Sequence, residues 1–172
     1  LAAHIANSFD AALIGVGAEL VYPVVVGGFG ETMVAASAEA VASDLEAAER
    51  NVELVAKDVG KGHEWRGQTD FPELAIARHS RAADLIVAGP HQGMGVGFYG
   101  SASPGELLMQ CGRPILIAPP QMEKLDASSI LIAWKDTRES RRAISDALPF
   151  LKKAAQVLIV GICEGGQAEA DL

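Results

Sequence analysis

The stretch ADLIVAGPHQGMGVGFYGSASPGELLMQCGRPILIAP, residues Ala83–Pro119, decides the fold class of this chain. A short apolar strand, Leu85–Ala88, leads into a glycine-rich segment and then a helix, and the helix leads into a second apolar strand, Ile115–Ala118. Parallel α/β proteins use this unit to hold anionic ligands at the carboxyl ends of their strands. The stretch therefore predicts an α/β domain with a parallel sheet.

The start of the helix in this stretch is well marked. Ser103 is the expected N-cap, Pro104 fits the first helical position, and Glu106 completes an S-x-x-E capping box. The first N–H groups of a helix have no partner within it and lie at the positive end of its dipole, so a phosphate would suit them. The alternative is a flexible loop closed by a neutral cap, because helix starts are far commoner than phosphate sites.

The rest of the chain alternates between strand and helix patterns. Strands are expected at Ala12–Val16, His63–Gly67, Ile130–Trp134 and Val157–Ile162, the second of them at a sheet edge. Helices are expected at Leu1–Phe9, Glu31–Lys57, Phe71–Ala82 and Glu139–Ala154. This alternation predicts a mostly parallel sheet with helices on both faces, in which Ala12–Val16, Leu85–Ala88 and Ile115–Ala118 are buried strands.

Two of the expected helices carry further signals. The long helix has an apolar stripe made of Val34, Val41, Leu45, Ala48, Val52 and Val55. The helix that follows Thr69 has Asp70 and Glu73 at the spacing of a capping box. The stripe is predicted to face the sheet, and Asp70 to be the N-cap.

The two ends of the chain are similar to each other. DAALIGVGAE at Asp10–Glu19 resembles AQVLIVGICE at Ala155–Glu164, at an offset of 145 residues from Leu13 to Leu158. At this offset the strand Ile130–Trp134 has its counterpart before residue 1, so the chain is expected to begin within a helix and to end early in a second copy of the unit. Chance similarity between two apolar strands is the alternative.

Three segments resemble the universal stress protein family. They are ADLIVAGPHQG at Ala83–Gly93, GRPILIAPP at Gly112–Pro120 and ILIAWKDTRESRRAISDALPFLKKA at Ile130–Ala154. The resemblance covers most of the chain and implies a tandem arrangement: residues 1–119 form a first repeat without its opening strand, residues 120–128 a linker, and residues 129–172 the start of a second repeat. It also implies an open five-stranded parallel sheet with helices on both faces, of the adenine-nucleotide-hydrolase-like, Rossmann-like three-layer type.

The resemblance also implies a ligand, because many members of the family bind ATP or another adenine nucleotide. The residues that would bind it are Gly89, His91, Gly93, Gly95, Gly97, Gly100, Ser101 and Ser103. Nucleotide-binding members share a loop of the form G-x2-G-x9-G-[ST], in which Gly89 matches the first glycine and Gly100 with Ser101 the closing pair. Gln92 stands at the second glycine position, with altered spacing to Gly100. For His91, a surface position in the loop is the alternative to a phosphate contact.

The second repeat departs from the family at Lys135, where nucleotide-binding members carry an aspartate near the end of the first strand. A lysine would not coordinate Mg²⁺, which prefers oxygen ligands. It would either contact a phosphate or pair at the surface with Asp136 or Glu139. The hypothesis is that this repeat binds no magnesium nucleotide.

Composition limits the remaining function classes. The formal net charge of −8 argues against a nucleic-acid partner or an anionic membrane surface, and no apolar run approaches the ~18–20 residues of a membrane span. The two cysteines form no CxxC motif and the four histidines show no metal-ligand spacing, so no metal ligand and no catalytic residue is singled out. A cytoplasmic location is expected.

Two main functions follow. The first is a non-enzymatic stress-response regulator with an adenine-nucleotide (ATP) site, and a weak ATPase is a variant of it. The second is a dimerisation or interaction module of the same fold that binds no nucleotide. Both include a homodimer, or an intramolecular pseudo-dimer, through the strand Ile115–Ala118.

Overall fold

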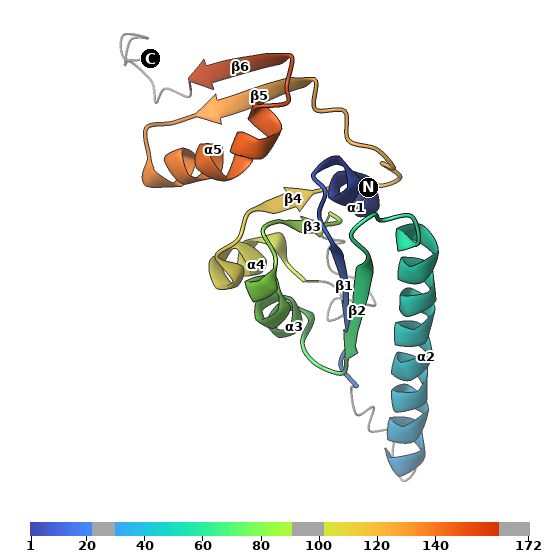
Figure 1. Cartoon of the computed structure of the whole chain (residues 1–172). Helices are drawn as coiled ribbons and strands as arrows, with labels where there is room; N and C mark the ends of the chain where they lie inside the picture. Colours follow the sequence, from blue (N-terminus) through green and yellow to red (C-terminus); the bar gives the residue numbers. More distant parts are fainter. Residues whose placement is uncertain (22–29, 91–101, 162–172) are drawn as a thin grey trace. The chain divides into compact units, whose positions relative to one another are not determined.

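The computed structural model describes residues 1–21, 30–90 and 102–161 of the chain. The chain divides into two compact units, Leu1–Lys124 and Leu125–Leu172, and the boundary falls within residues 120–128 (Figure 1). The fold is mixed α/β, and every strand pairing in the described residues is parallel. The described strands form three two-stranded sheets.

The described part of the first unit contains four strands and their connecting helices. In chain order the described elements are α1 (Ala2–Ser8), β1 (Leu13–Ala18), α2 (Gly30–Ala56), β2 (His63–Gln68), α3 (Pro72–His79), the 3-10 turn η1 (Ser80–Ala82), β3 (Ile86–Ala88), α4 (Pro104–Cys111) and β4 (Ile115–Ile117). Strand β1 pairs with β2, and β3 pairs with β4. The order of elements matches the sequence prediction, and the ends of the elements differ by at most three residues.

Helix α2 lies along the β1–β2 pair, as Figure 1 shows, and covers one of its faces. A core cluster of Ala6, Ala56 and Val59 ties α1 to the end of α2, and Val52 and Leu13 pack against this cluster. The predicted apolar stripe of α2 is correct at its buried Val41 and wrong at Val55, which is 63% exposed. Ala56 is fully buried instead, in the cluster that it forms with Ala6 of α1 and with Val59.

The Trp65 ring lies on the α2 face of the β1–β2 pair, over two glycines of β1. A Cβ added at Gly15 would meet Val52 at 2.9 Å and Trp65 at 3.0 Å, and a Cβ added at Gly17 would overlap the ring itself. Glycine at these two positions therefore provides the space that a large aromatic side chain needs between strand and helix.

Helix α3 packs against β1 and against α4. Ala75 and Leu107 are both fully buried. The predicted capping box of α3 is wrong: the N-cap is Phe71, in an extended conformation with φ −62° and ψ 126°. The Asp70 carboxylate instead accepts hydrogen bonds from the N–H of the N-cap residue Phe71 at 2.8 Å and from Arg78, in the last turn of α3, at 3.1 Å.

The strands of the first unit are less buried than the sequence predicts. All six residues of β1 are half-buried, and β3 buries Ile86 while its other residues are half-buried. In β4, Ile117 is 42% exposed. The reason is the small size of each sheet, because a strand in a two-stranded pair has one edge without a neighbour.

The second unit consists of β5 (Ser129–Trp134), α5 (Arg138–Leu151) and β6 (Gln156–Gly161) in its described part. Half-buried and exposed residues alternate along β5, and α5 contacts this strand. The alternation places α5 over the face that carries Ile130, Ile132 and Trp134. The opposite face carries Leu131, which is 61% exposed.

The alignment of the two chain ends at an offset of 145 residues stays a prediction. Both faces of β1 contact a helix, because α2 and α3 each pack against this strand, so the cover of Leu13 does not show which residue of β6 corresponds to it.

Candidate functional site

The glycine-rich segment follows β3 and precedes α4. Of the eight residues predicted to bind a ligand, the structure places two: Gly89 directly follows β3, and Ser103 is the N-cap of α4, with φ −69° and ψ 126°. The other six, His91, Gly93, Gly95, Gly97, Gly100 and Ser101, lie outside the described residues.

The start of α4 is partly as predicted. Pro104 occupies the first turn, and the first backbone bond of the helix runs from the Leu107 N–H to the Ser103 carbonyl oxygen at 3.0 Å. The side chain of Ser103 accepts no hydrogen bond from the first turn, so the serine half of the predicted capping box does not form. The first N–H groups of α4 therefore accept no help from the Ser103 side chain, which forms no hydrogen bond to them. Glu106 places a carboxylate in the same first turn of the helix.

Strands β3 and β4 form a parallel strand–helix–strand unit with α4 between them. Strands β3 and β4 are parallel, with Ile86 beside Ile115, and α4 connects them. The carboxyl end of β3 and the amino end of α4 are joined by residues 89–103, as in α/β proteins that bind anions at strand ends. Gly112 ends α4 in the left-handed conformation at φ 58°, which suits glycine and turns the chain into β4.

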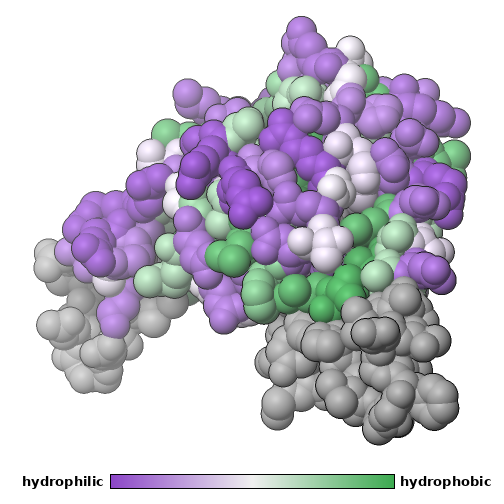
Figure 2. Space-filling view, turned by 90° about the horizontal axis from the view of Figure 1, so that it is seen from below, coloured by the Kyte–Doolittle hydropathy of each residue, from purple (hydrophilic) through white to green (hydrophobic). Residues whose placement is uncertain are grey.

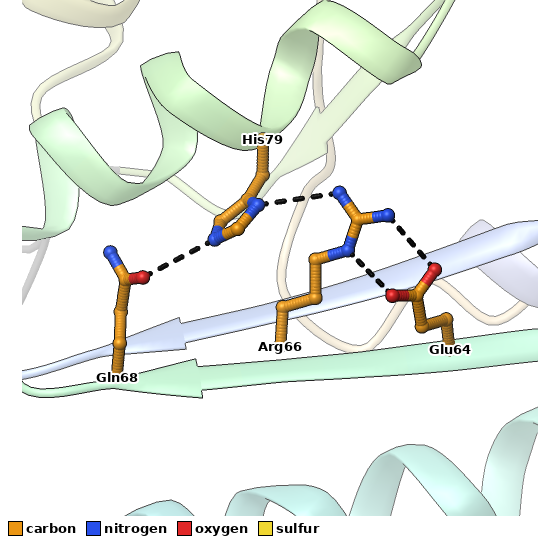
Figure 3. Close-up of polar contacts among 4 residues, drawn as sticks. All are labelled: Glu64, Arg66, Gln68 and His79. Carbon is orange, nitrogen blue, oxygen red and sulfur yellow. Dashed lines mark hydrogen bonds and ion pairs between the residues drawn. The ribbon is translucent and has the colours of Figure 1, made fainter.

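A polar network on β2 and α3 is a second candidate site, and Figure 3 shows it. Glu64, Arg66 and Gln68 occupy every second position of β2 and therefore share one face of the strand. The Arg66 guanidinium donates two parallel hydrogen bonds of 2.9 Å to the Glu64 carboxylate. Its third nitrogen lies 3.3 Å from Nδ1 of His79, in the last turn of α3.

The partners of His79 define its tautomer. A guanidinium can only donate, so Nδ1 of His79 accepts from Arg66, and Nε2 carries the ring hydrogen. Nε2 lies 3.3 Å from the side-chain oxygen of Gln68, which accepts this hydrogen. The amide nitrogen of Gln68 donates in turn to Asp70 at 3.3 Å, which extends the network to the start of α3.

This hydrogen-bond network has the properties of a structural contact between β2 and α3. Each guanidinium nitrogen of Arg66 donates to a neighbour, and both ring nitrogens of His79 are engaged, so neither group is presented to a substrate. The hydrogen bond from Arg66 lowers the pKa of the Glu64 carboxyl, and the carboxylate raises the pKa of Arg66. The network therefore holds α3 on the face of β2 opposite α2.

Sequence reasoning did not single out this network. The available signal was the placement of glutamate, arginine and glutamine at every second position of an expected edge strand. Such a row indicates a strand face that is not packed in an apolar core. The contribution of His79 has no sequence signal, because it depends on how α3 docks on the sheet.

At the end of β5, the carboxylates expected to pair with Lys135 are bonded to arginines. Asp136 pairs with Arg141, and Glu139 pairs with Arg138. Thr137 is the N-cap of α5, and its side-chain oxygen accepts from the Ser140 N–H at 3.2 Å.

Residues 1–21, 30–90 and 102–161 contain no group of three or more His, Cys, Asp or Glu side chains able to hold a metal ion. The thiol of Cys111, at the end of α4, is free and half-buried. None of the helices in this part of the chain is both long enough and apolar enough to cross a lipid bilayer.

Comparisons with family models, curated proteins and solved structures found no match to this chain.

Proposed function

We propose that this chain is a module of the universal stress protein type that binds ATP or another adenine nucleotide and acts as a non-enzymatic regulator of a stress response. One observation carries the proposal: parallel strands β3 and β4 are joined through a glycine-rich segment and through α4, which begins at Ser103 and Pro104. Backbone N–H groups at such a helix start favour a phosphate. The nucleotide would bind through the glycine-rich segment and the first turn of α4.

In this proposal, β1–β2 and β3–β4 belong to one open parallel sheet of the five-stranded type, with helices on both faces. The packing of α3 against both β1 and α4 supports it, because these contacts link the two strand pairs within one unit. Residues 1–119 are then a first repeat without its opening strand, residues 120–128 a linker, and residues 129–172 the start of a second repeat.

A second candidate function is a dimerisation module of the same fold without a nucleotide. Two observations favour it: Glu106 places a negative charge in the first turn of α4, and Ile117 of β4 is 42% exposed. The outer edge of β4 pairs with no described strand, so it is available to a second copy or to the second repeat. In both candidates this strand is the proposed contact of a homodimer or pseudo-dimer.

Isothermal titration of the purified chain with ATP and with ADP tests the first candidate. We expect binding that Gly100→Val and Ser101→Ala weaken at least tenfold. The matched control is Gly60→Val, at an exposed glycine far along the chain from the glycine-rich segment, and it should leave binding unchanged. Absence of binding by both nucleotides would favour the dimerisation module, and phosphate release from bound ATP would indicate a weak ATPase.

The charge of Glu106 gives a second, more local test. Glu106→Gln removes a carboxylate from the positive end of α4, so it should tighten nucleotide binding by roughly two- to fivefold, the ratio expected from a helix-end charge of ~0.3–1 kcal/mol. Glu73→Gln makes the same change in the first turn of α3 and should have no effect on affinity. Equal effects of the two changes would place the nucleotide elsewhere.

A further inference from the structure

We propose that the contact between β2 and α3 is acid-sensitive, because it includes a hydrogen bond that exists only while the His79 ring is neutral. Protonation of His79 breaks this bond and loosens the end of α3 from the sheet. The inference goes beyond the proposed function and does not depend on nucleotide binding. It rests on three features of the described residues: the direction of the bond, the charges around the ring, and the existing partners of the nearby carboxylates.

The first feature is the direction of the hydrogen bond between Arg66 and His79. A guanidinium nitrogen lies 3.3 Å from Nδ1, and a guanidinium has no acceptor, so Nδ1 supplies the lone pair. The other ring nitrogen, Nε2, donates to the side-chain oxygen of Gln68 at 3.3 Å (Figure 3). A second proton can therefore bind only at Nδ1, where it removes the acceptor and places an N–H group against the guanidinium.

The second feature is the balance of charge around the ring. Glu64 and Arg66 of β2 form one ion pair, and Asp70 and Arg78 form another, so these groups sum to zero while His79 is neutral. Protonation adds a positive charge that touches a second one. The side chain of Arg66 is only 26% exposed, so solvent screens this repulsion less than it would at an open surface.

The third feature is that both nearby carboxylates already have partners. The two oxygens of Glu64 each accept a hydrogen bond of 2.9 Å from Arg66. The Asp70 carboxylate accepts from a backbone N–H and from Arg78. A protonated His79 must therefore displace Arg66 in order to reach Glu64, and this displacement breaks the same network.

The remaining groups on and around α3 do not compensate the added charge. Glu73 lies in the first turn of α3, at the other end of the helix from His79. Among the elements that pack against α3, β1 has no titratable side chain, η1 carries Arg81, and α4 carries Glu106 and Cys111. In the described residues, the hydrogen-bond partners of the His79 ring are on β2. The carboxyl end of a helix favours a positive charge, but this interaction is the same whether or not the helix lies on the sheet, so it does not hold α3 in place.

The expected loosening is local. Ala75 of α3 and Leu107 of α4 are fully buried, and their apolar packing does not change with pH. His79 is in the last turn of α3 and is followed directly by η1. Acid should therefore release the last turn of α3 and η1, while the first turns of α3 stay packed against β1 and α4.

Amide hydrogen exchange in the full chain tests this inference. Exchange rates in the last turn of α3 and in η1 are measured at pH 7.5 and pH 5.5, a range in which histidine side chains gain a proton, and each is divided by the rate of an unstructured peptide at the same pH. We expect the protection to fall at least fivefold at pH 5.5. His79→Gln keeps an acceptor and a donor but does not titrate, so its protection should be equal at the two pH values.

The matched control is His63→Gln, at an exposed histidine of the same strand, and it should keep the fall seen in the parent. No fall in the parent, or an equal fall in His79→Gln, would overturn the proposal. Nitrogen NMR of the ring gives a direct check, because at pH 7.5 the hydrogen should be on Nε2. A hydrogen on Nδ1 at this pH would contradict the direction of the bond.

Arg66→Met separates this effect from general acid destabilisation. Without Arg66, the Glu64 carboxylate is free to accept a hydrogen bond from the protonated ring of His79. Protection in the last turn of α3 should therefore not fall between pH 7.5 and pH 5.5 in this variant, although it starts from a lower value. A fall as large as that of the parent would show that the guanidinium is not the cause.

Discussion

The two units of the chain use the same local elements and differ in how much they bury. Among the described residues the first unit buries Ile5, Ala6, Val41, Ala56, Val59, Ala75, Ile86 and Leu107. The described part of the second unit buries none, although the sequence of β5 and β6 is the more apolar. Strand hydrophobicity therefore does not by itself produce a core.

The difference arises from the number of layers around each strand pair. Strands β1 and β2 have α2 on one face, where Val52 approaches Gly15, and α3 on the other, where His79 meets Arg66. In the described residues, β5 and β6 have α5 on one face. The exposed apolar side chains of these two strands include Leu131, Val157, Leu158, Ile159 and Val160. Figure 2 shows one face of the molecule, on which apolar side chains likewise reach the surface among hydrophilic ones.

The largest expected difference between the units is in the effect of a deleted leucine side chain. Leu107→Ala removes a fully buried side chain between α4 and its neighbours and should lower the free energy of unfolding by about 2–5 kcal/mol. Leu148→Ala, in α5, removes a side chain that is 43% exposed and should cost less than about 1 kcal/mol. Urea unfolding followed by circular dichroism measures both, and similar costs would mean that the second unit has a core after all.

The second expected effect concerns the glycines beneath Trp65. Gly17→Ala introduces a Cβ that overlaps the indole ring, so the ring must move, at a cost of about 1–3 kcal/mol. Gly60→Ala is the matched control, because its added Cβ would meet nothing closer than 3.9 Å. Trp65 fluorescence should shift in the first variant and stay unchanged in the second. An unperturbed spectrum in Gly17→Ala would contradict the packing described above.

The order of strands and helices could be predicted from the sequence, because apolar runs and helical stripes are local patterns. The burial of the strands could not be predicted, because it depends on which strands and helices pack against each strand, and a local pattern does not specify these. The sequence predicts that β1 is buried, and the structure shows that all of its residues are half-buried.

The sequence predicts where α3 and α4 begin, but it does not predict which hydrogen bonds form at these helix starts. Ser103 is the N-cap as expected, yet its side chain accepts no bond from the first turn. Asp70 was expected to cap α3 and instead bonds to Arg78, which lies two turns along the same helix. For the ligand site, sequence reasoning located Gly89 and Ser103 correctly at the end of β3 and the start of α4, and the remaining site stays a prediction.

The two N-caps provide a finer comparison of the units. Thr137 of the second unit accepts a hydrogen bond from the Ser140 N–H, so Thr137→Ala should destabilise α5 by about 1 kcal/mol. Ser103→Ala in the first unit removes no such bond and should cost a few tenths of that amount. Hydrogen exchange of the amides in the first turn of each helix measures the local effect. A larger loss at Ser103 would show that its side chain caps α4 in solution.

The smallest expected effect compares two exposed carboxylates, Glu64 in the first unit and Glu139 in the second. Hydrogen bonds from Arg66 and from Arg138 lower their respective pKa values. A carboxyl group whose pKa is lowered on folding stabilises the fold above its unfolded pKa, and this contribution is lost as the pH falls through the lower folded value. Carbon-detected NMR titration should therefore give both groups pKa values below those of ordinary glutamates.

Arg66→Met should raise the pKa of Glu64 and weaken the contact between β2 and α3, which would be seen as faster amide hydrogen exchange around His79. Arg138→Met should raise the pKa of Glu139 without such a change, because Arg138 and Glu139 are neighbours in the first turn of α5 and connect no second element. Equal protection around His79 in the parent and in Arg66→Met would show that the network does not hold α3 in place.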